Sequence, residues 1–362
     1  MAPTETPMPA RDAWHQRLIE PLLPPLTALL IAAVVGDLLI LSFGQSPREV
    51  FRLLVEGTWA NAYGFGQVLY KATTLACTGL AVALGIRAGM FNIGAEGQLA
   101  LGGFAAAMVG LGLPAGTPMA LAVLLCMVAA GAGGSLAAAV PGALKARFGA
   151  SEVIVTIMMN FIVAALLNWL VATKVSVAES LHTPEIHAGA VPRLAEAIPA
   201  FHGSAANFTI LVAVALAIAV WWYLFRTRAG YELRAVGLQP DAAEYGGIDV
   251  GRTWWRTLLL SGALAGLGGV NYVLGYKQYY EEGFAAGAGY LGIAVALVGR
   301  NHPGGVLVAS LLFATLSQGA LAVNALVPKQ MVDVLTAVVI IAVATAVPEV
   351  QRMLRAVRGR LA

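Results

Sequence analysis

The stretch GIRAGMFNIGAEGQLALGG, residues 85–103, decides the fold of this chain. It ends one apolar run at Arg87 and leads into a second, at whose entrance stand three polar residues, Asn92, Glu96 and Gln98. An ionised carboxylate in lipid costs several kcal/mol unless it faces protein, water or a partner, so Glu96 is predicted to lie in a protected or wet place. The glycines of the stretch favour close packing of backbones, or a helix that begins inside a membrane protein.

The composition is that of a polytopic membrane protein. Of 362 residues, 59% are apolar and 11% are charged, and the mean hydropathy is +0.78. A soluble domain carries about 25% charged residues, so this chain has too few to cover a water-facing surface. The basic residues are scattered among short loops, which gives no support to a nucleic-acid partner. Cys77 and Cys126 lie inside apolar runs without metal or disulfide spacing and are predicted to be core residues.

Apolar runs near the length of about 20 residues that crosses a bilayer recur along the chain. They predict an all-α fold with about ten transmembrane helices, at about 21–43, 67–86, 90–113, 119–140, 152–172, 208–225, 257–276, 287–299, 304–325 and 331–347. No convincing cleavage site follows the first run, which is therefore expected to remain as a spanning helix, with a charged loop at 48–56 behind it. Aromatic residues at the span ends, Tyr279 and Tyr280 among them, are predicted to form an interfacial belt, with a base-stacking role for one of them as the alternative.

The distribution of basic residues predicts that both termini are cytosolic. With the N-terminus inside, 15 Lys and Arg residues fall on the cytosolic side and 6 outside, as the positive-inside rule requires. The predicted parts are a cytosolic tail at 1–20, a transmembrane domain at 21–350 and a basic cytosolic tail at 351–362. The transmembrane domain includes a periplasmic loop at 173–207 and a cytosolic loop at 226–256.

A short internal repeat predicts two inverted halves. GMFNIGAEGQLALGG at 89–103 and GAGYLGIAVALVG at 287–299 share glycine spacing and begin the third and eighth predicted spans. An odd offset of five spans turns the second copy upside down. Inverted repeats place a substrate path at the pseudo-symmetry interface, often beside broken helices.

The cytosolic loop contains the signals of a short helix. Pro240 and Asp241 are favourable at a helix start and Gly246–Gly247 at a helix end, which predicts a helix at about 240–245. From the loop alone, an ordinary solvated segment is the alternative to a docking element.

Three separated motifs occur in a characteristic order: FNIGAEGQ at 91–98, SEVIVTIMMN at 151–160 and YELRAVGLQPDAAEYGGI at 231–248. Together they resemble the inner-membrane permeases of bacterial ABC importers, in the branch that serves simple sugars and nucleosides. The similarity is greatest to guanosine and purine-nucleoside permeases fed by basic-membrane-protein-type lipoprotein receptors. It extends over about residues 20–350.

The resemblance implies a permease subunit of an ATP-driven importer in the bacterial inner membrane, paired with a second, related permease in a heterodimer. It implies a lipoprotein receptor on the periplasmic side and an ABC ATPase on the cytosolic side. A purine nucleoside is the leading substrate and a simple sugar the alternative. The short helix would be a coupling helix docked into the ATPase, and the residues of this contact would be Arg234, Pro240, Asp241, Ala242, Ala243 and Tyr245.

The chain carries no P-loop of its own. A P-loop needs a glycine before its lysine, and the five lysines here follow Tyr, Leu, Thr, Tyr and Pro. ATP and Mg are therefore expected on the partner ATPase, and no cofactor or metal is expected in this chain. It also lacks the convergent cluster of His, Asp and Glu that an enzyme would need, so no enzymatic activity is expected.

Polar residues inside the predicted spans are the candidates for a substrate path, namely Asn92, Glu96, Gln98, Asn160 and Asn168. Glu152, Thr156 and Asn160 are four residues apart and share one helix face. Buried amides must be hydrogen-bonded, and the partner is either a substrate with many hydroxyls or ring nitrogens, or a neighbouring helix.

Glu96 also allows two interpretations. It lines the path or holds a gate, or it is a structural carboxylate that caps or bridges helices, with Asn92 as cap of a helix beginning at Ile93. A transporter of another class, coupled to an ion gradient, would use Glu96, Asp37 or Asp333 as ion carriers.

Overall fold

The computed structural model describes residues 23–114, 116–177 and 180–328, with a few separate residues between 330 and 342. Apart from two isolated β-bridges, these residues form helices, turns and irregular connections, which confirms the predicted all-α class for the described part of the chain. The chain divides into two compact units, one made of residues 1–54 and 323–362 and the other of residues 55–322.

The first unit contains α2 (Leu23–Ser42), which matches the first predicted span. It is followed by α3 (Pro47–Glu56), where the sequence predicts a charged loop. That prediction is wrong because the charges are spaced for one helix face. Glu49 and Arg52 approach to 4.0 Å across one turn, while Val50 is buried on the other side. The tenth predicted span and both tails lie wholly or largely outside the described residues.

The second unit holds the long helices. They are α4 (Ala62–Arg87), α5 (Ala95–Gly112), α6 (Met119–Phe148), α7 (Glu152–Leu170), α9 (Thr209–Arg226), α12 (Val250–Val273), α13 (Ala288–Val298) and α14 (Pro303–Val323). Their limits have local causes. The Asn61 side chain caps α4 by accepting from the Gly64 amide, and Gly149, with φ +63°, ends α6 in the left-handed conformation.

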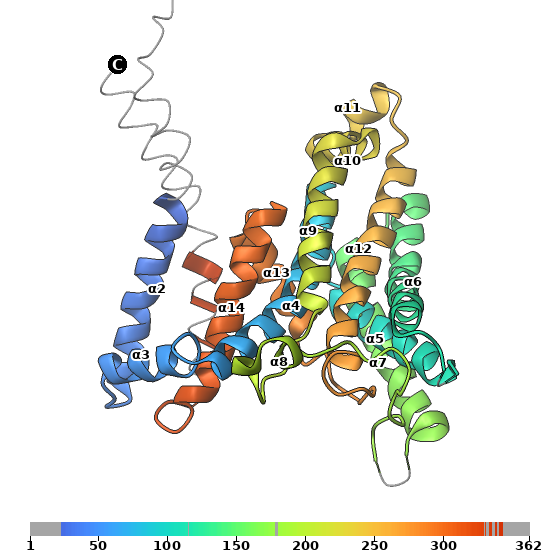
Figure 1. Ribbon diagram of the computed structural model, residues 1–362. Coiled ribbons are helices and arrows are strands. Elements are labelled where there is room, and N and C mark those ends of the chain that lie inside the picture. Colours follow the sequence, from blue (N-terminus) through green and yellow to red (C-terminus); the bar gives the residue numbers. More distant parts are fainter. Residues whose placement is uncertain are drawn as a thin grey trace, which may run out of the picture. The chain divides into compact units, whose positions relative to one another are not determined.

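Short elements gather at the two ends of this second unit. At one end, α10 (Arg228–Leu238) and α11 (Pro240–Tyr245) lie beyond the ends of α9 and α12 (Figure 1). At the other end lies the segment that carries η1 (Val171–Val175), α8 (Leu194–Ala197) and η2 (Pro199–Phe201). The two ends therefore present different surfaces, one with a short projecting helix and one with a long, locally ordered loop.

Five helices of the described residues are long and apolar enough to cross a membrane, and they correspond to the second, fourth, fifth, sixth and ninth predicted spans. The shorter α13 and the part of α2 from Ala33 to Ser42 are also apolar. The third and seventh predicted spans are present as α5 and α12. The chain is thus a multi-pass, all-α membrane protein.

Within the core of the second unit, α6 and α12 pack closely, backbone against backbone, at facing small residues. A methyl group added to Gly134 of α6 would lie 2.0 Å from the Gly262 carbonyl oxygen of α12, and one added to Gly266 would lie 2.3 Å from the Ala130 carbonyl oxygen. Small residues spaced four apart let two helices in a membrane pack this closely. Cys126 is a free, buried residue of the same core, and Cys77 is free and buried in α4, as predicted.

Candidate functional site

Asn92 and Gln98 form a buried amide pair at the start of α5. Asn92 Nδ2 donates to Gln98 Oε1 at 2.8 Å and to Ser261 Oγ of α12 at 2.7 Å, while Gln98 Nε2 donates back to Asn92 Oδ1 at 3.1 Å. Asn92 Oδ1 also accepts from the Gly94 amide at 2.9 Å, and α5 begins at Ala95 rather than at Ile93. Both side-chain amides are hydrogen-bonded inside the protein, and they join the start of α5 to α12.

Glu96 reaches from the first turn of α5 to the N-terminus of α13. Its Oε1 accepts from the Gly287 amide at 2.8 Å and its Oε2 from the Gly289 amide at 2.7 Å. A carboxylate at a helix N-terminus satisfies backbone N–H groups that have no partner within the helix and faces the positive end of the helix dipole. The backbone of the 287–299 segment therefore supplies the protected surroundings expected for Glu96.

The polar side chains on one face of α7 also bond to neighbouring parts of the protein. Asn160, 5% exposed, accepts from the Gly97 amide at 2.9 Å and donates to the Ile93 carbonyl at 2.9 Å and the Tyr290 hydroxyl at 3.2 Å. The Thr156 hydroxyl donates to the carbonyl of Glu152, whose carboxylate pairs with Lys145 at 2.9 Å. These contacts bind α7 to α5, α6 and α13.

Asn168 differs from the other four predicted path residues. It is exposed, and its side chain has no hydrogen-bond partner among the described residues. Together with Glu96 and Asn160 it lines a cavity of about 300 Å³, which the segment from Tyr280 to Ala286 bounds on another side. The structure thus brings three of the five predicted residues to one cavity, here called the amide cavity, and leaves one amide there open to a solute.

Tyr280 shows what the sequence prediction missed. The sequence predicts it in an interfacial belt, as one of a pair of tyrosines at a span end, but it is 3% exposed and packs edge-on against Phe104, with ring centroids 5.3 Å apart. That part of the belt prediction is wrong, because the segment after α12 folds back into the bundle instead of following the membrane surface. The Thr183 amide donates to the Tyr280 carbonyl at 2.8 Å and fixes this return.

Replacing Glu96 by alanine should lower the thermal stability of the purified protein, because two amides at the start of α13 would lose their acceptor. Each unsatisfied buried donor costs about 1–3 kcal/mol, so a loss of about 2–6 kcal/mol is expected for the pair. Glu96→Gln keeps one acceptor oxygen and should lose less. Melting midpoints of the three proteins in detergent check this order, and equal midpoints would contradict the capping role.

The short helix predicted at 240–245 is present as α11 at Pro240–Tyr245, with Pro240 and Asp241 in its first turn. Tyr245 is 97% exposed, and Leu238, just before α11, is 85% exposed. Ala242 is exposed as expected, but Ala243 is only 6% exposed. The expectation that Ala243 is offered at the surface is wrong, because the inner side of this short helix packs onto the adjoining helices.

Arg234 does not lie on the outer face with Tyr245. Its guanidinium stands over the Phe225 ring at 5.3 Å, the Arg87 guanidinium stands over the same ring at 5.9 Å, and His302 stacks on it with centroids 5.8 Å apart. Burial and the neighbouring Arg87 lower the pKa of His302. Arg234 thus fixes α10 to the end of α9 by a cation–π contact, which no local sequence pattern predicts.

Comparison with known proteins places the chain in a transport family. The family described as "Branched-chain amino acid transport system / permease component" matches residues 64–344. The guanosine ABC transporter permease protein NupP of Bacillus subtilis is 36% identical over 90% of this chain and 93% of its own length. The nucleoside ABC transporter permease protein NupB of Lactococcus lactis is 34% identical over 89% and 90%, respectively.

Two further similarities bear on the substrate and on a second subunit. The glucose ABC transporter permease protein TsgB13 of Haloferax volcanii is 32% identical over 88% of this chain and 85% of its own length. In Bacillus subtilis a second guanosine permease, NupQ, is also similar, at 30% identity over 68% of this chain. The matched region covers most of the described helices, and the chain therefore belongs to the family of branched-chain amino acid transport system permease components.

Proposed function

We propose that this chain is one permease subunit of an ATP-driven importer that carries a nucleoside, in the first place a purine nucleoside, across the bacterial inner membrane. As a permease component it is a part of a transport system and not an enzyme. The observation that carries the mechanism is α11, a short helix with a nearly fully exposed tyrosine at one end of the second unit. An exposed aromatic side chain on a rigid, projecting helix is suited to a protein partner.

The ATPase is that partner. ATP and Mg bind to it, and the closing and opening of its halves move α11 and, through α10, the ends of α9 and α12. The residues that take part are Pro240, Asp241, Ala242 and Tyr245 on α11, with Arg234 holding α10 in place. The distribution of basic residues, read by the positive-inside rule, supports a cytosolic location for this end and for both termini.

The substrate enters at the opposite end, where the 173–207 loop meets a lipoprotein receptor. This loop is held by a bridge within it, between Arg193 and Asn207, and by one from His182 to Glu281 of the segment after α12, which gives the receptor a defined surface. The names of the similar proteins support nucleosides first, and the glucose permease supports a simple sugar as second candidate.

A second, related permease completes the membrane part as a heterodimer. Two different guanosine ABC transporter permease proteins of Bacillus subtilis, NupP and NupQ, are both similar to this chain, which favours two unlike subunits. Within this subunit, about ten spans form two inverted repeats, and the contact of Glu96 with Gly287 and Gly289 joins the two repeat segments. The proposed extent of the transmembrane domain is 21–350, with cytosolic tails at 1–20 and 351–362.

Uptake into proteoliposomes tests the proposal. The proteoliposomes would contain this chain together with the second permease, the ATPase and the receptor. ATP would be supplied on the ATPase side or left out. ATP-dependent uptake of labelled guanosine, without competition from ribose, is expected. ATP-dependent ribose uptake would keep the mechanism and overturn the substrate. Uptake by this chain alone, driven by an ion gradient and indifferent to ATP, would overturn the mechanism.

A further inference from the structure

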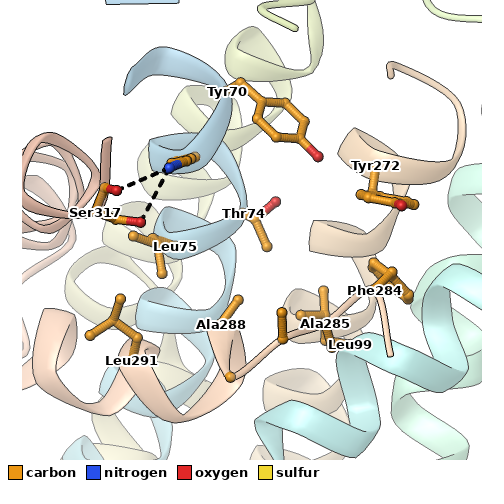
Figure 2. A pocket seen from close by; sticks show the side chains of 13 residues that line it. Tyr70, Thr74, Leu75, Leu99, Tyr272, Phe284, Ala285, Ala288, Leu291 and Ser317 are labelled. Carbon is orange, nitrogen blue, oxygen red and sulfur yellow. Dashed lines mark hydrogen bonds between the residues drawn. The ribbon is translucent and has the colours of Figure 1, made fainter. Parts of the chain in front are cut away.

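A second cavity, of about 220 Å³, lies between α4, α5, α12, α13 and α14. It is here called the aromatic cavity, because the rings of Tyr70, Tyr272 and Phe284 stand around it (Figure 2). None of the five predicted path residues lines it. It shares the segment from Phe284 to Ala286 with the amide cavity, so this short segment separates two spaces inside the bundle.

The flat walls of the aromatic cavity are fixed by their neighbours. The Tyr272 and Phe284 rings are 4.9 Å apart, and Phe284 also packs edge-on against Tyr280 at 5.3 Å. The Tyr272 hydroxyl donates to the Glu281 carboxylate, which holds the ring in one orientation. Rigid aromatic faces at a cavity surface are suited to stacking with a planar ring.

The cavity has few polar groups, and most of them are occupied. Lys71 Nζ donates to the carbonyl and the hydroxyl of Ser317 at 3.2 and 3.3 Å, and Thr74 Oγ1 accepts from Asn271 at 2.9 Å. The Tyr70 hydroxyl, in contrast, has no hydrogen-bond partner among the described residues. Figure 2 shows it directed from α4 across the cavity toward Tyr272.

We propose that the aromatic cavity binds the heterocyclic base of the transported nucleoside. This inference rests on the proposed function and assigns a site to its substrate. The base stacks against Tyr272 and Phe284, and Tyr70 bonds to a ring nitrogen or an exocyclic oxygen. A free sugar fits this lining less well, because most of its hydroxyls would lose water and find no partner among leucine and alanine side chains.

A tyrosine exchange tests the polar contact. Tyr70→Phe removes the hydroxyl and keeps the ring, and the guanosine concentration for half-maximal uptake should rise about fivefold, the effect of one hydrogen bond of about 1 kcal/mol. Tyr276→Phe is the matched control, since Tyr276 packs against Tyr70 at 5.2 Å but does not line the cavity. Equal values for the two variants would overturn the proposal.

Protection of an introduced cysteine tests occupancy without any need for transport. Leu291→Cys places a thiol in the cavity wall, and the native Cys77 and Cys126 are buried. In the assembled complex without ATP, guanosine at ten times its dissociation constant should slow modification by N-ethylmaleimide about tenfold. Ribose should not slow the modification. Leu181→Cys, at an exposed position of the 173–207 loop, should react at the same rate with and without guanosine.

The two measurements separate the failure of the proposed function from the failure of this inference. If wild-type proteoliposomes take up guanosine with ATP but guanosine does not protect Leu291→Cys, the base binds elsewhere and the proposed function stands. If no ATP-dependent guanosine uptake occurs, the proposed function fails, and protection by guanosine still decides whether the cavity binds the base. Protection by ribose as well would overturn the assignment to a base.

Discussion

A valine in place of Gly134 should prevent the protein from assembling its core, whereas a valine at Gly131, one turn earlier in α6, should be tolerated. A Cβ atom at Gly134 would stand 2.0 Å from the Gly262 carbonyl oxygen and 2.9 Å from the Gly266 Cα atom. At Gly131 the nearest atom, the Ala263 Cβ, is 3.9 Å away, an ordinary contact. Backbone atoms of α12 cannot turn aside as a side chain can, so the two helices must separate.

The cost at Gly134 should be about 3 kcal/mol or more, at the upper end of what overpacking costs in a core, because the displaced atoms belong to a helix backbone. Yield in membranes and the elution profile in detergent measure the effect, with Gly131→Val as control for the loss of glycine and the gain of a β-branched side chain. Gly134→Ala, which adds only the Cβ atom, should give an intermediate loss. Equal yields of the two valine variants would contradict the close contact.

Hydropathy predicted the apolar helices well, because burial in lipid leaves a direct record in composition. The predicted span at 287–299 and α13 differ by one residue at each end, and the first span and α2 also nearly coincide. Hydropathy alone predicts loops where helices carry many charged residues, because such helices lack an apolar run. Both α10 and the first turns of α12 are helical although they are rich in charge, and their signals were the caps Thr227 and Asp249, which accept from Gly230 and Arg252.

The sequence predicts which residues belong to the candidate site, but it does not predict which of them are in contact. The sequence marked Glu96 and the 287–299 segment as corresponding parts of a repeat, yet no local pattern shows that a carboxylate and two amides about 190 residues apart meet. The same limit applies to Ala243, since six residues do not define which face of a helix packs inward. Tyr280 is buried only because its segment returns into the bundle, a feature of topology rather than composition.

Replacing Tyr245 by aspartate should uncouple transport from ATP hydrolysis while leaving the folded protein unchanged. The side chain is 97% exposed, so its loss should change the stability of this chain by less than about 0.5 kcal/mol. An aromatic side chain at the centre of an interface is worth about 2 kcal/mol or more, so ATPase binding should weaken at least about tenfold. The measurements are ATPase recovered with the purified permease and ATP-driven uptake.

Two further variants separate docking from folding. Tyr63→Asp carries the same change at the N-terminal end of α4, where the tyrosine is 50% exposed, and should retain the ATPase. Ala243→Glu buries a charge, because Ala243 is 6% exposed, and should lower the amount of folded protein together with uptake. Tyr245→Asp should lower ATPase recovery and uptake without lowering the amount of folded protein. Full recovery and full uptake in that variant would exclude α11 as the coupling helix, since a coupling helix cannot lose its most exposed contact residue to a charge without effect.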